Sequence, residues 1–200
     1  MIPMPTLTTE RLLLRPFAPA DAPELQRLAG HIEIARNTLS IPHPYPDGAA
    51  EHWIGGHAEQ FAASGDVHFA IVPRDSGVLA GAIGLLLNRD HERAEIGYWI
   101  GVQWWGRGYA AEAAQATVDY GFTVATLNRI FAAHFTRNPA SGRVLQKIGM
   151  RHEGTQRQVF RKWGEFLDAE QYAILRRDWA AASRSPRPAT RGEGWREAPG

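Results

Sequence analysis

The segment from Gln103 to Ala113, QWWGRGYAAEA, constrains the fold of this chain more than any other stretch. It follows an apolar, β-rich run (Ala94–Val102) and precedes small residues that recur with the 3.6-residue period of a helix. Glycine at 106 and 108 lets several backbone N–H groups turn to one side, and the helix start adds unpaired N–H groups and a positive dipole end. The sequence therefore predicts either a phosphate or diphosphate site, with Arg107 as a charged gate, or a tight turn with an exposed arginine.

Other phosphate-binding motifs fit this segment less well. A P-loop requires Gly-Lys-Ser/Thr at the end of the loop, and the segment has no such sequence. A dinucleotide-binding loop requires a third glycine near position 111, which is alanine here, and an acidic residue after the next strand. The segment therefore matches neither fingerprint.

The rest of the pattern predicts an α/β domain with a mixed, mostly antiparallel central sheet flanked by helices. Expected strands cover residues 11–17, 67–74, 78–89, 94–102, 129–136 and 166–175. One expected helix starts with a capping box of Asp21 and Glu24 and reaches Ile32, and a second is capped by Asp47 and reaches Phe61. Two more follow Gly108 and Asn138. The first of these carries small or apolar residues at 110, 113, 114, 117, 118, 121 and 122, and the second ends at Gly149.

Composition limits the function classes. The chain has 200 residues, of which 44% are hydrophobic, enough for one core. Its 22 Lys and Arg nearly balance 21 Asp and Glu, which argues against a dedicated nucleic-acid binder. It contains no cysteine, which excludes disulfides, thiolate metal sites and a cysteine nucleophile.

The chain shows one compositional boundary. Residues 183–200 are rich in Pro, Gly, Arg and Glu and carry too little apolar surface to fold, so we predict a domain over 1–182 and a disordered tail over 183–200. No apolar run approaches the length of a membrane span, and the start does not resemble a signal peptide. We therefore expect a soluble, cytoplasmic protein that does not bind a membrane.

Two segments, AEIGYWIGVQWWGRGYAAEA and NPASGRVLQKIGMRHEG, resemble the GCN5-related N-acetyltransferase (GNAT) superfamily. The run from Gln103 to Gly108 matches the superfamily's Gln/Arg-x-x-Gly-x-Gly/Ala signature. The opening TERLLLRPF and the ending FLDAEQYAILRRDW are similar to the branch of ribosomal-protein N-terminal acetyltransferases named Rim in bacteria, so the resemblance covers residues 6–179. It implies a single GNAT-like domain whose central strands splay apart at an acyl-CoA site.

The resemblance implies acetyl-CoA as co-substrate, with its diphosphate on the backbone of the glycine loop. The residues concerned are Gln103, Gly106, Arg107, Gly108, Tyr109 and Ala110. It also implies that the pantetheine arm pairs with the preceding strand, where backbone groups of Ile100 and Val102 are the candidates. Gly97 in that strand is either a bulge or a close-packing position. Asn138 is either a side-chain partner of the pantetheine amide or a helix N-cap, and both roles are compatible.

The reaction that the resemblance implies is attack of an amine on a thioester. A carboxylate must take a proton from the amine, directly or through one water, and Glu95 is the first candidate, with Glu165 the second. Either could instead be a solvated charge on a strand. Many relatives place a tyrosine acid at the position of Leu145. Because that position is leucine here, Ser141 is the substitute acid that the Rim-like branch suggests. The alternative is that the Ser141 hydroxyl only forms a hydrogen bond with the backbone at the start of the helix.

The sequence constrains the amine acceptor less than it constrains the acetyl-CoA site. Tyr45 and Trp53 in and after the loop IPHPYPDGAAEHW, together with Trp99, are candidate wall residues, although tryptophans more often pack. The only carboxylates of that loop segment are Asp47 and Glu51, few for a polycationic acceptor. His52 and His57 stand five apart rather than four, so we expect no metal.

These residues favour transfer of an acetyl group to a primary amine, most simply a peptide or protein N-terminus, by direct attack in a ternary complex. A small amine such as an antibiotic or polyamine is the alternative acceptor. A catalytically silent CoA-binding sensor is the alternative from another class, because the glycine loop would serve it equally well. The sequence leaves a monomer and a homodimer both open.

Overall fold

The computed structural model describes residues 4–184 and contains eight strands and seven α-helices in that part. The strands are β1 (Leu7–Thr8), β2 (Leu12–Pro16), β3 (Val67–Pro73), β4 (Gly81–Asn88), β5 (Arg93–Ile100), β6 (Arg129–Phe135), β7 (Arg151–Lys162) and β8 (Glu165–Leu175). They form one sheet in the order β1-β2-β3-β4-β5-β6-β8-β7. All neighbouring strands are antiparallel except β5 and β6, so the prediction of a mixed, mostly antiparallel sheet is confirmed.

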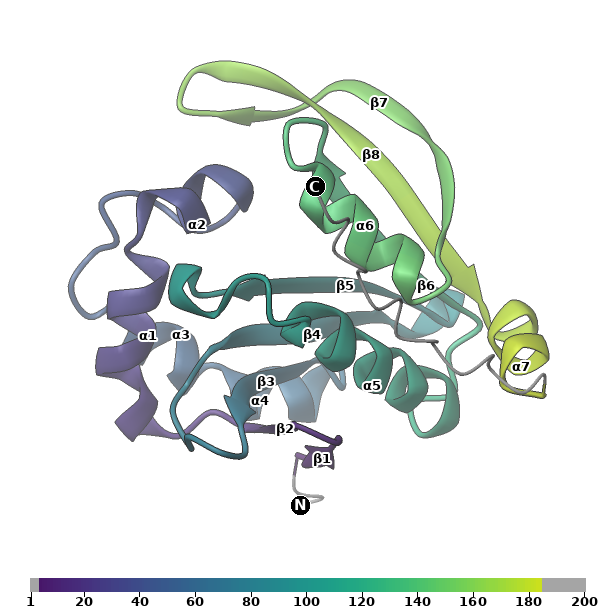
Figure 1. The fold of residues 1–200 in the computed structure, drawn as a ribbon, viewed down its shortest axis with the longest axis horizontal. Helices are drawn as coiled ribbons and strands as arrows, with labels where there is room; N and C mark the ends of the chain where they lie inside the picture. Colours follow the sequence, from purple (N-terminus) through teal and green to yellow (C-terminus); the bar gives the residue numbers. More distant parts are fainter. Residues whose placement is uncertain (1–3, 185–200) are drawn as a thin grey trace, which may run out of the picture.

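Helices cover both faces of this sheet. They are α1 (Ala22–Ala29), α2 (Ile32–Asn37), α3 (Ala49–Gly55), α4 (His57–Ala63), α5 (Tyr109–Thr123), α6 (Pro139–Lys147) and α7 (Arg176–Arg184), with 3-10 turns at Pro19–Asp21, Arg89–His91 and Val102–Trp104. α5 and α6 lie on one face, and α1 to α3 gather at one end of the sheet (Figure 1). In the described part of the chain, no helix is long and apolar enough to cross a membrane.

Two clusters of buried side chains form the core. The larger lies under α5 and α6 and contains Phe69, Leu85, Val118, Phe122 and Ile130. The smaller lies on the other face, where α1 and α3 pack against β3. Of the predicted positions on α5, Ala110 is half-buried against the core and the other six are buried, which confirms the face assigned to this helix: Ala113, Ala114, Thr117, Val118, Gly121 and Phe122.

β5 and β6 diverge soon after they begin. Their parallel pairing covers only Arg93 to Glu95 on β5, opposite Arg129 to Phe131 on β6. Beyond these three pairs the ladder stops, so the two strands separate toward their carboxyl ends. The splayed central strands predicted from the resemblance are confirmed, and the glycine loop and α6 follow the two separated ends.

Two helix predictions were wrong in extent. The predicted helix from Ala22 to Ile32 is divided, because α1 is capped at Gly30 and α2 begins anew with the His31 side chain accepting a hydrogen bond from the N–H of Glu33. The predicted second helix is divided at Gly56 into α3 and α4.

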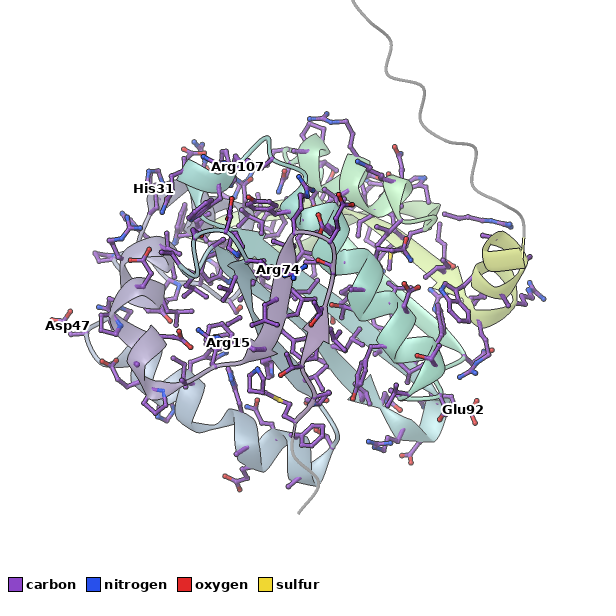
Figure 2. The ribbon with its side chains drawn as sticks, turned by 60° about the horizontal axis from the view of Figure 1, so that its bottom comes forward. Arg15, His31, Asp47, Arg74, Glu92 and Arg107 are labelled. Atoms are coloured by element: carbon purple, nitrogen blue, oxygen red, sulfur yellow. The ribbon has the colours of Figure 1, made fainter. Side chains whose placement is uncertain are left out.

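Two predicted caps were also wrong. The Asp21 carboxylate does not cap α1 with Glu24; it accepts two hydrogen bonds of 2.7 Å from Arg15 on β2 and one of 2.7 Å from the N–H of Ala18. Gly48, with φ of 77°, occupies the N-cap of α3, while Asp47 projects from the surface and accepts from Gln26 at 3.1 Å (Figure 2). Each aspartate is held by a side chain from another element of the fold, Asp21 by Arg15 on β2 and Asp47 by Gln26 on α1.

The β7–β8 hairpin extends beyond the rest of the sheet and approaches the segment after α2 (Figure 1). Lys162 near its tip is only 8% exposed, and its Nζ donates to the carbonyl oxygens of Thr38, Leu39 and Ile41 at 2.6, 3.1 and 2.8 Å. This contact fixes the tip of the hairpin to the segment after α2. The predicted tail, 183–200, begins within the end of α7, and residues 185–200 lie outside the described part.

Candidate functional site

The glycine loop has the backbone shape that an anion site requires. Gly106 and Gly108 have φ of 76° and 79°, the left-handed region that side chains other than glycine rarely adopt. Among the described residues, the N–H groups of Gly106 to Ala110 have no hydrogen-bond partner, and α5 has no side-chain cap. These free donors and the positive end of the 15-residue α5 dipole can hold a diphosphate together.

An ion pair between Arg11 and Glu112 supports this loop, and sequence reasoning missed it. Glu112, on the first turns of α5, accepts from the Nε of Arg11 at 2.7 Å, from the Arg11 N–H at 2.8 Å and from Thr9 Oγ1 at 2.6 Å. The Nη1 of Arg11 then donates to the carbonyl oxygen of Arg107 at 2.9 Å. Arg11 thus fixes the Arg107 carbonyl, while the loop N–H groups have no partner among the described residues. The pair Arg11 and Glu112 is separated by 101 residues, and no local pattern signals it.

The other residues predicted to contact acetyl-CoA lie on or next to the glycine loop. Arg107 is exposed on the loop at the start of α5 (Figure 2), with its guanidinium 4.9 Å from the Trp104 ring. Gln103 is exposed in the 3-10 turn Val102–Trp104. The carbonyl oxygens of Ile100 and Val102 accept from Trp105, at 2.6 Å from its indole and at 3.1 Å from its backbone N–H. Each carbonyl retains a second lone pair for a pantetheine amide.

Asn138 and Ser141 lie across the opening, at the start of α6. The Asn138 side-chain oxygen accepts from the N–H of Ser141 at 3.3 Å, which is the N-cap role considered above. Among the described residues its amide nitrogen has no partner, so it remains available to a ligand carbonyl. Leu145 is fully buried in the larger core cluster, one turn beyond Ser141, and offers no acid.

Tyr98 connects β5 to the start of α6. Its hydroxyl lies 2.9 Å from Ser141 Oγ and donates to the Ser141 carbonyl at 3.2 Å. Burial raises the pKa of Tyr98 to about 12, although the hydrogen bond with Ser141 opposes this. Tyr98 therefore remains a neutral donor throughout the physiological pH range and fixes the position of Ser141.

Glu95 lies on the opposite face of β5 from Tyr98. The side chains of Ala94, Ile96 and Ile100 are buried under α5, while Arg93, Glu95 and Gly97 are exposed on the other face. The Glu95 carboxyl is accessible, yet surrounding protein atoms remove part of its hydration and this raises its pKa. Such a carboxylate is a better base than a fully solvated one. Glu165, the second candidate, lies at the tip of the β7–β8 hairpin, outside the β6–β8 pairing.

Gly97 differs from both predicted roles. The β4–β5 register is continuous through its pairing with Gly84, so there is no bulge. A Cβ at Gly97 would meet no atom within 4 Å, so the position is not closely packed either. The missing side chain leaves open space next to Glu95, on the face where an acceptor would approach.

The three aromatic candidates for the acceptor wall all contact the smaller core cluster. Tyr45, Trp53 and Trp99 are partly buried against it. Trp53 also packs edge-on against His57 at 4.3 Å and Phe17 at 5.2 Å between ring centroids. The environment of Trp53 favours a packing role, whereas Trp99 neighbours Gly97 along the exposed face of β5.

His57 is a buried packing residue. It is 4% exposed and stacks on His68 at 4.3 Å, and both of its ring nitrogens lack a hydrogen-bond partner among the described residues. Burial, with the neighbouring His68, lowers the pKa of His57 to about 4. Within residues 4–184 no three His, Asp or Glu side chains are grouped as metal ligands.

Comparison with known proteins places the chain in a family. Residues 11–151 match the family described as "Acetyltransferase (GNAT) domain". The chain is 35% identical over 178 residues to "Uncharacterized N-acetyltransferase YoaA" of Bacillus subtilis, covering 86% of this chain and 97% of that protein. It is 29% identical over 179 residues to "Putative ribosomal N-acetyltransferase YdaF" of B. subtilis, covering 85% and 94%. It is 30% identical over 111 residues to "Spermidine N(1)-acetyltransferase" of Escherichia coli, covering 55% and 60%.

A solved structure agrees with these relatives. A GNAT-family acetyltransferase from Bacillus anthracis has a TM-score of 0.76 and 28% sequence identity, over 86% of this chain and 99% of that one. The likeness therefore extends over nearly the whole length of that protein. This chain belongs to the GNAT acetyltransferase family and is an acetyl-CoA-dependent N-acetyltransferase.

Proposed function

We propose that this enzyme acetylates the N-terminal α-amine of a peptide or protein, by direct attack on acetyl-CoA in a ternary complex. The observation that carries the proposal is the open strip on β5, where Glu95 stands beside the empty space over Gly97. With the amine at the carboxylate, the side chain of the first residue of a peptide can occupy this space. An α-amine, with a pKa of ~8, also needs a weaker base than a lysine amine with a pKa of ~10.

The proposed reaction conserves atoms and charge. Glu95 takes one proton from the ammonium group, directly or through a water, and returns it to solvent later. The amine nitrogen attacks the thioester carbonyl carbon, the C–N bond forms, and the C–S bond then breaks. The second amine proton is lost as the amide forms, and one proton reaches the departing sulfur, so that the products are an N-acetyl amide and CoA with a free thiol.

Ser141 is the proposed donor toward the sulfur. Its hydroxyl lies 2.9 Å from Tyr98, a partner that remains protonated because its pKa is about 12. Tyr98 can orient the Ser141 hydroxyl and return a proton to it after transfer. Thiols have a pKa of ~8.5, so a proton donor assists the departure of the sulfur but is not required for it.

A small amine is the second candidate acceptor. The similarity to a spermidine acetyltransferase supports it, but that similarity covers only 55% of this chain. The exposed face of β5 next to Glu95 carries the cation Arg93 rather than further carboxylates. A polycationic acceptor would be repelled by this charge, whereas the name of the ribosomal N-acetyltransferase relative is consistent with a protein acceptor.

The acceptor class can be tested directly. Purified enzyme is mixed with acetyl-CoA and with peptides that begin with different residues, and free thiol is measured over time. Matched reactions contain spermidine, spermine or an aminoglycoside. We expect turnover with a subset of the peptides, blocked when the peptide N-terminus is already acetylated. Turnover on the small amines alone would contradict the proposal.

Substitution of Gly97 by alanine should separate folding from acceptor binding. A Cβ there meets no protein atom within 4 Å, and alanine is more favourable than glycine in a strand, so stability should be unchanged or slightly raised. The methyl group would occupy the space proposed for the acceptor, and we expect kcat/KM for the acceptor to fall by about tenfold. Steady-state kinetics and thermal unfolding measure the two effects. Gly55→Ala in α3, also without neighbours at the new Cβ, is the control expected to retain activity.

A further inference from the structure

A cavity lies next to Glu95, on the face of β5 that carries Arg93, Glu95 and Gly97. This cavity of about 480 Å³ opens between β5, β6, β7 and β8, and its lining includes Arg93, Arg129, Phe131, Glu153, Gln156 and Gln171. Phe131 forms the wall toward the proposed reaction centre, because it is the register partner of Glu95. The volume lies within the range of sites that bind small molecules or side chains.

The lining of this cavity carries one more positive than negative side chain. Arg129 is neutralised by Glu153 through two hydrogen bonds of 2.7 and 2.5 Å. Arg93 has no ion-pair partner among the described residues; its guanidinium lies 5.6 Å from the centre of the Phe131 ring. One positive charge therefore faces the cavity without a carboxylate of its own.

The remaining lining is suited to a polar group. Gln171 donates from its amide nitrogen to Gln156 at 2.9 Å, which orders two side-chain amides on the floor of the cavity. The amide nitrogen of Gln156 and the guanidinium of Arg93 are free donors, and both suit an oxygen anion. A carboxylate is the simplest such group on a peptide.

We propose that this cavity binds an acidic side chain at the second position of the acceptor peptide. Arg93 and Glu95 are two residues apart on the same face of β5, a separation of about 7 Å along a strand. One peptide residue plus the reach of an aspartate or glutamate side chain covers about this distance. With the α-amine at Glu95 and the peptide running toward Arg93, away from Gly97, the second side chain therefore reaches Arg93. This inference rests on the proposed function and adds the class of acceptor sequence.

The test uses three peptides that differ only at the second residue, which is Asp, Asn or Lys. With the wild-type enzyme and saturating acetyl-CoA, we expect kcat/KM for the Asp peptide to exceed that for the Asn peptide by about tenfold, and the Lys peptide to be poorest. Arg93→Gln should lower kcat/KM for the Asp peptide to about that for the Asn peptide. Arg93→Glu should reverse the order and favour Lys.

Arg177→Gln is the matched control, because Arg177 is exposed on α7 and its replacement changes the net charge equally. It should retain the preference for Asp. Activity on the Asn peptide shows that each variant is folded. Equal rates with all three peptides, or an unchanged preference in Arg93→Gln, would overturn the inference and leave the proposed function intact. Turnover of small amines without any peptide would overturn both.

A second copy of the chain could cover this cavity instead. Light scattering of the wild type and of Arg93→Glu distinguishes that outcome. A dimer that dissociates in Arg93→Glu, together with a flat peptide preference, would assign the cavity to self-association and contradict acceptor binding.

Discussion

Glu95→Gln is expected to lower kcat/KM for the acceptor by about 100-fold or more, the usual contribution of a general base, while CoA binds with unchanged affinity. Glutamine keeps the size and polarity of the side chain but cannot take the proton from the amine. Steady-state kinetics measures the first quantity and calorimetry with CoA the second. A chain that only sensed CoA would show no turnover in the wild type, so this pair of measurements also tests that alternative.

The pH dependence of kcat/KM is a second test of Glu95 as the general base. Because partial desolvation raises the pKa of Glu95, the acidic limb of wild-type kcat/KM should lie above the ordinary range of a glutamate. Glu95→Gln should lose this limb. Glu165→Gln, at the hairpin tip, should keep both the rate and the limb. If Glu165→Gln shows the large loss instead, the base is on the hairpin and the assignment of Glu95 is wrong.

Acid should destabilise the fold through His57 well before the carboxylates are protonated. The pKa of His57 is about 4 in the fold and near 6.5 in the unfolded chain, so its stabilising effect is full above pH 6.5 and is lost as the pH falls toward 4. Between pH 7 and pH 5 this corresponds to about 2 kcal/mol of the free energy of unfolding. Denaturant unfolding at these two pH values measures it.

The neighbours of His57 determine how specific this effect is. His68, stacked on it, also has its pKa lowered by burial and adds to the loss in the same direction. The carboxyls of Asp21 and Glu112 have lowered pKa values, so their contributions are lost only as the pH falls below about 4.5. His57→Phe keeps an aromatic ring beside Trp53 and should flatten the dependence between pH 7 and 5. His52→Gln, exposed on α3, should leave it unchanged.

Local chemistry made part of this molecule predictable from the sequence. Gly106 and Gly108 were identified because only glycine readily adopts the left-handed backbone that a strand-to-helix loop needs. The buried face of α5 followed from the 3.6-residue period of its small side chains, and Gly149, with φ of 87°, ends α6 as expected. Each of these features depends on residues close together in the chain.

The rest depends on contacts between side chains from different elements of the fold. Asp21 has the sequence of a helix cap, but Arg15 takes its carboxylate. His52 and His57 look alike in the sequence, yet only His57 is buried, because His68 on β3 packs against it. The free charge of Arg93 became apparent only when the fold paired Arg129 with Glu153. Propensity and spacing cannot reveal such partners, since they are set by the packing of the whole sheet.

The central claim is that the free N–H groups of the glycine loop hold the diphosphate of acetyl-CoA. Amide chemical shifts of ¹⁵N-labelled protein, followed during titration with CoA, test it most directly. We expect the amides of Gly106, Gly108 and Ala110 to shift most among the backbone signals, and inorganic pyrophosphate to shift the same amides more weakly. Saturation with CoA that leaves these amides unmoved while signals elsewhere shift would contradict the claim.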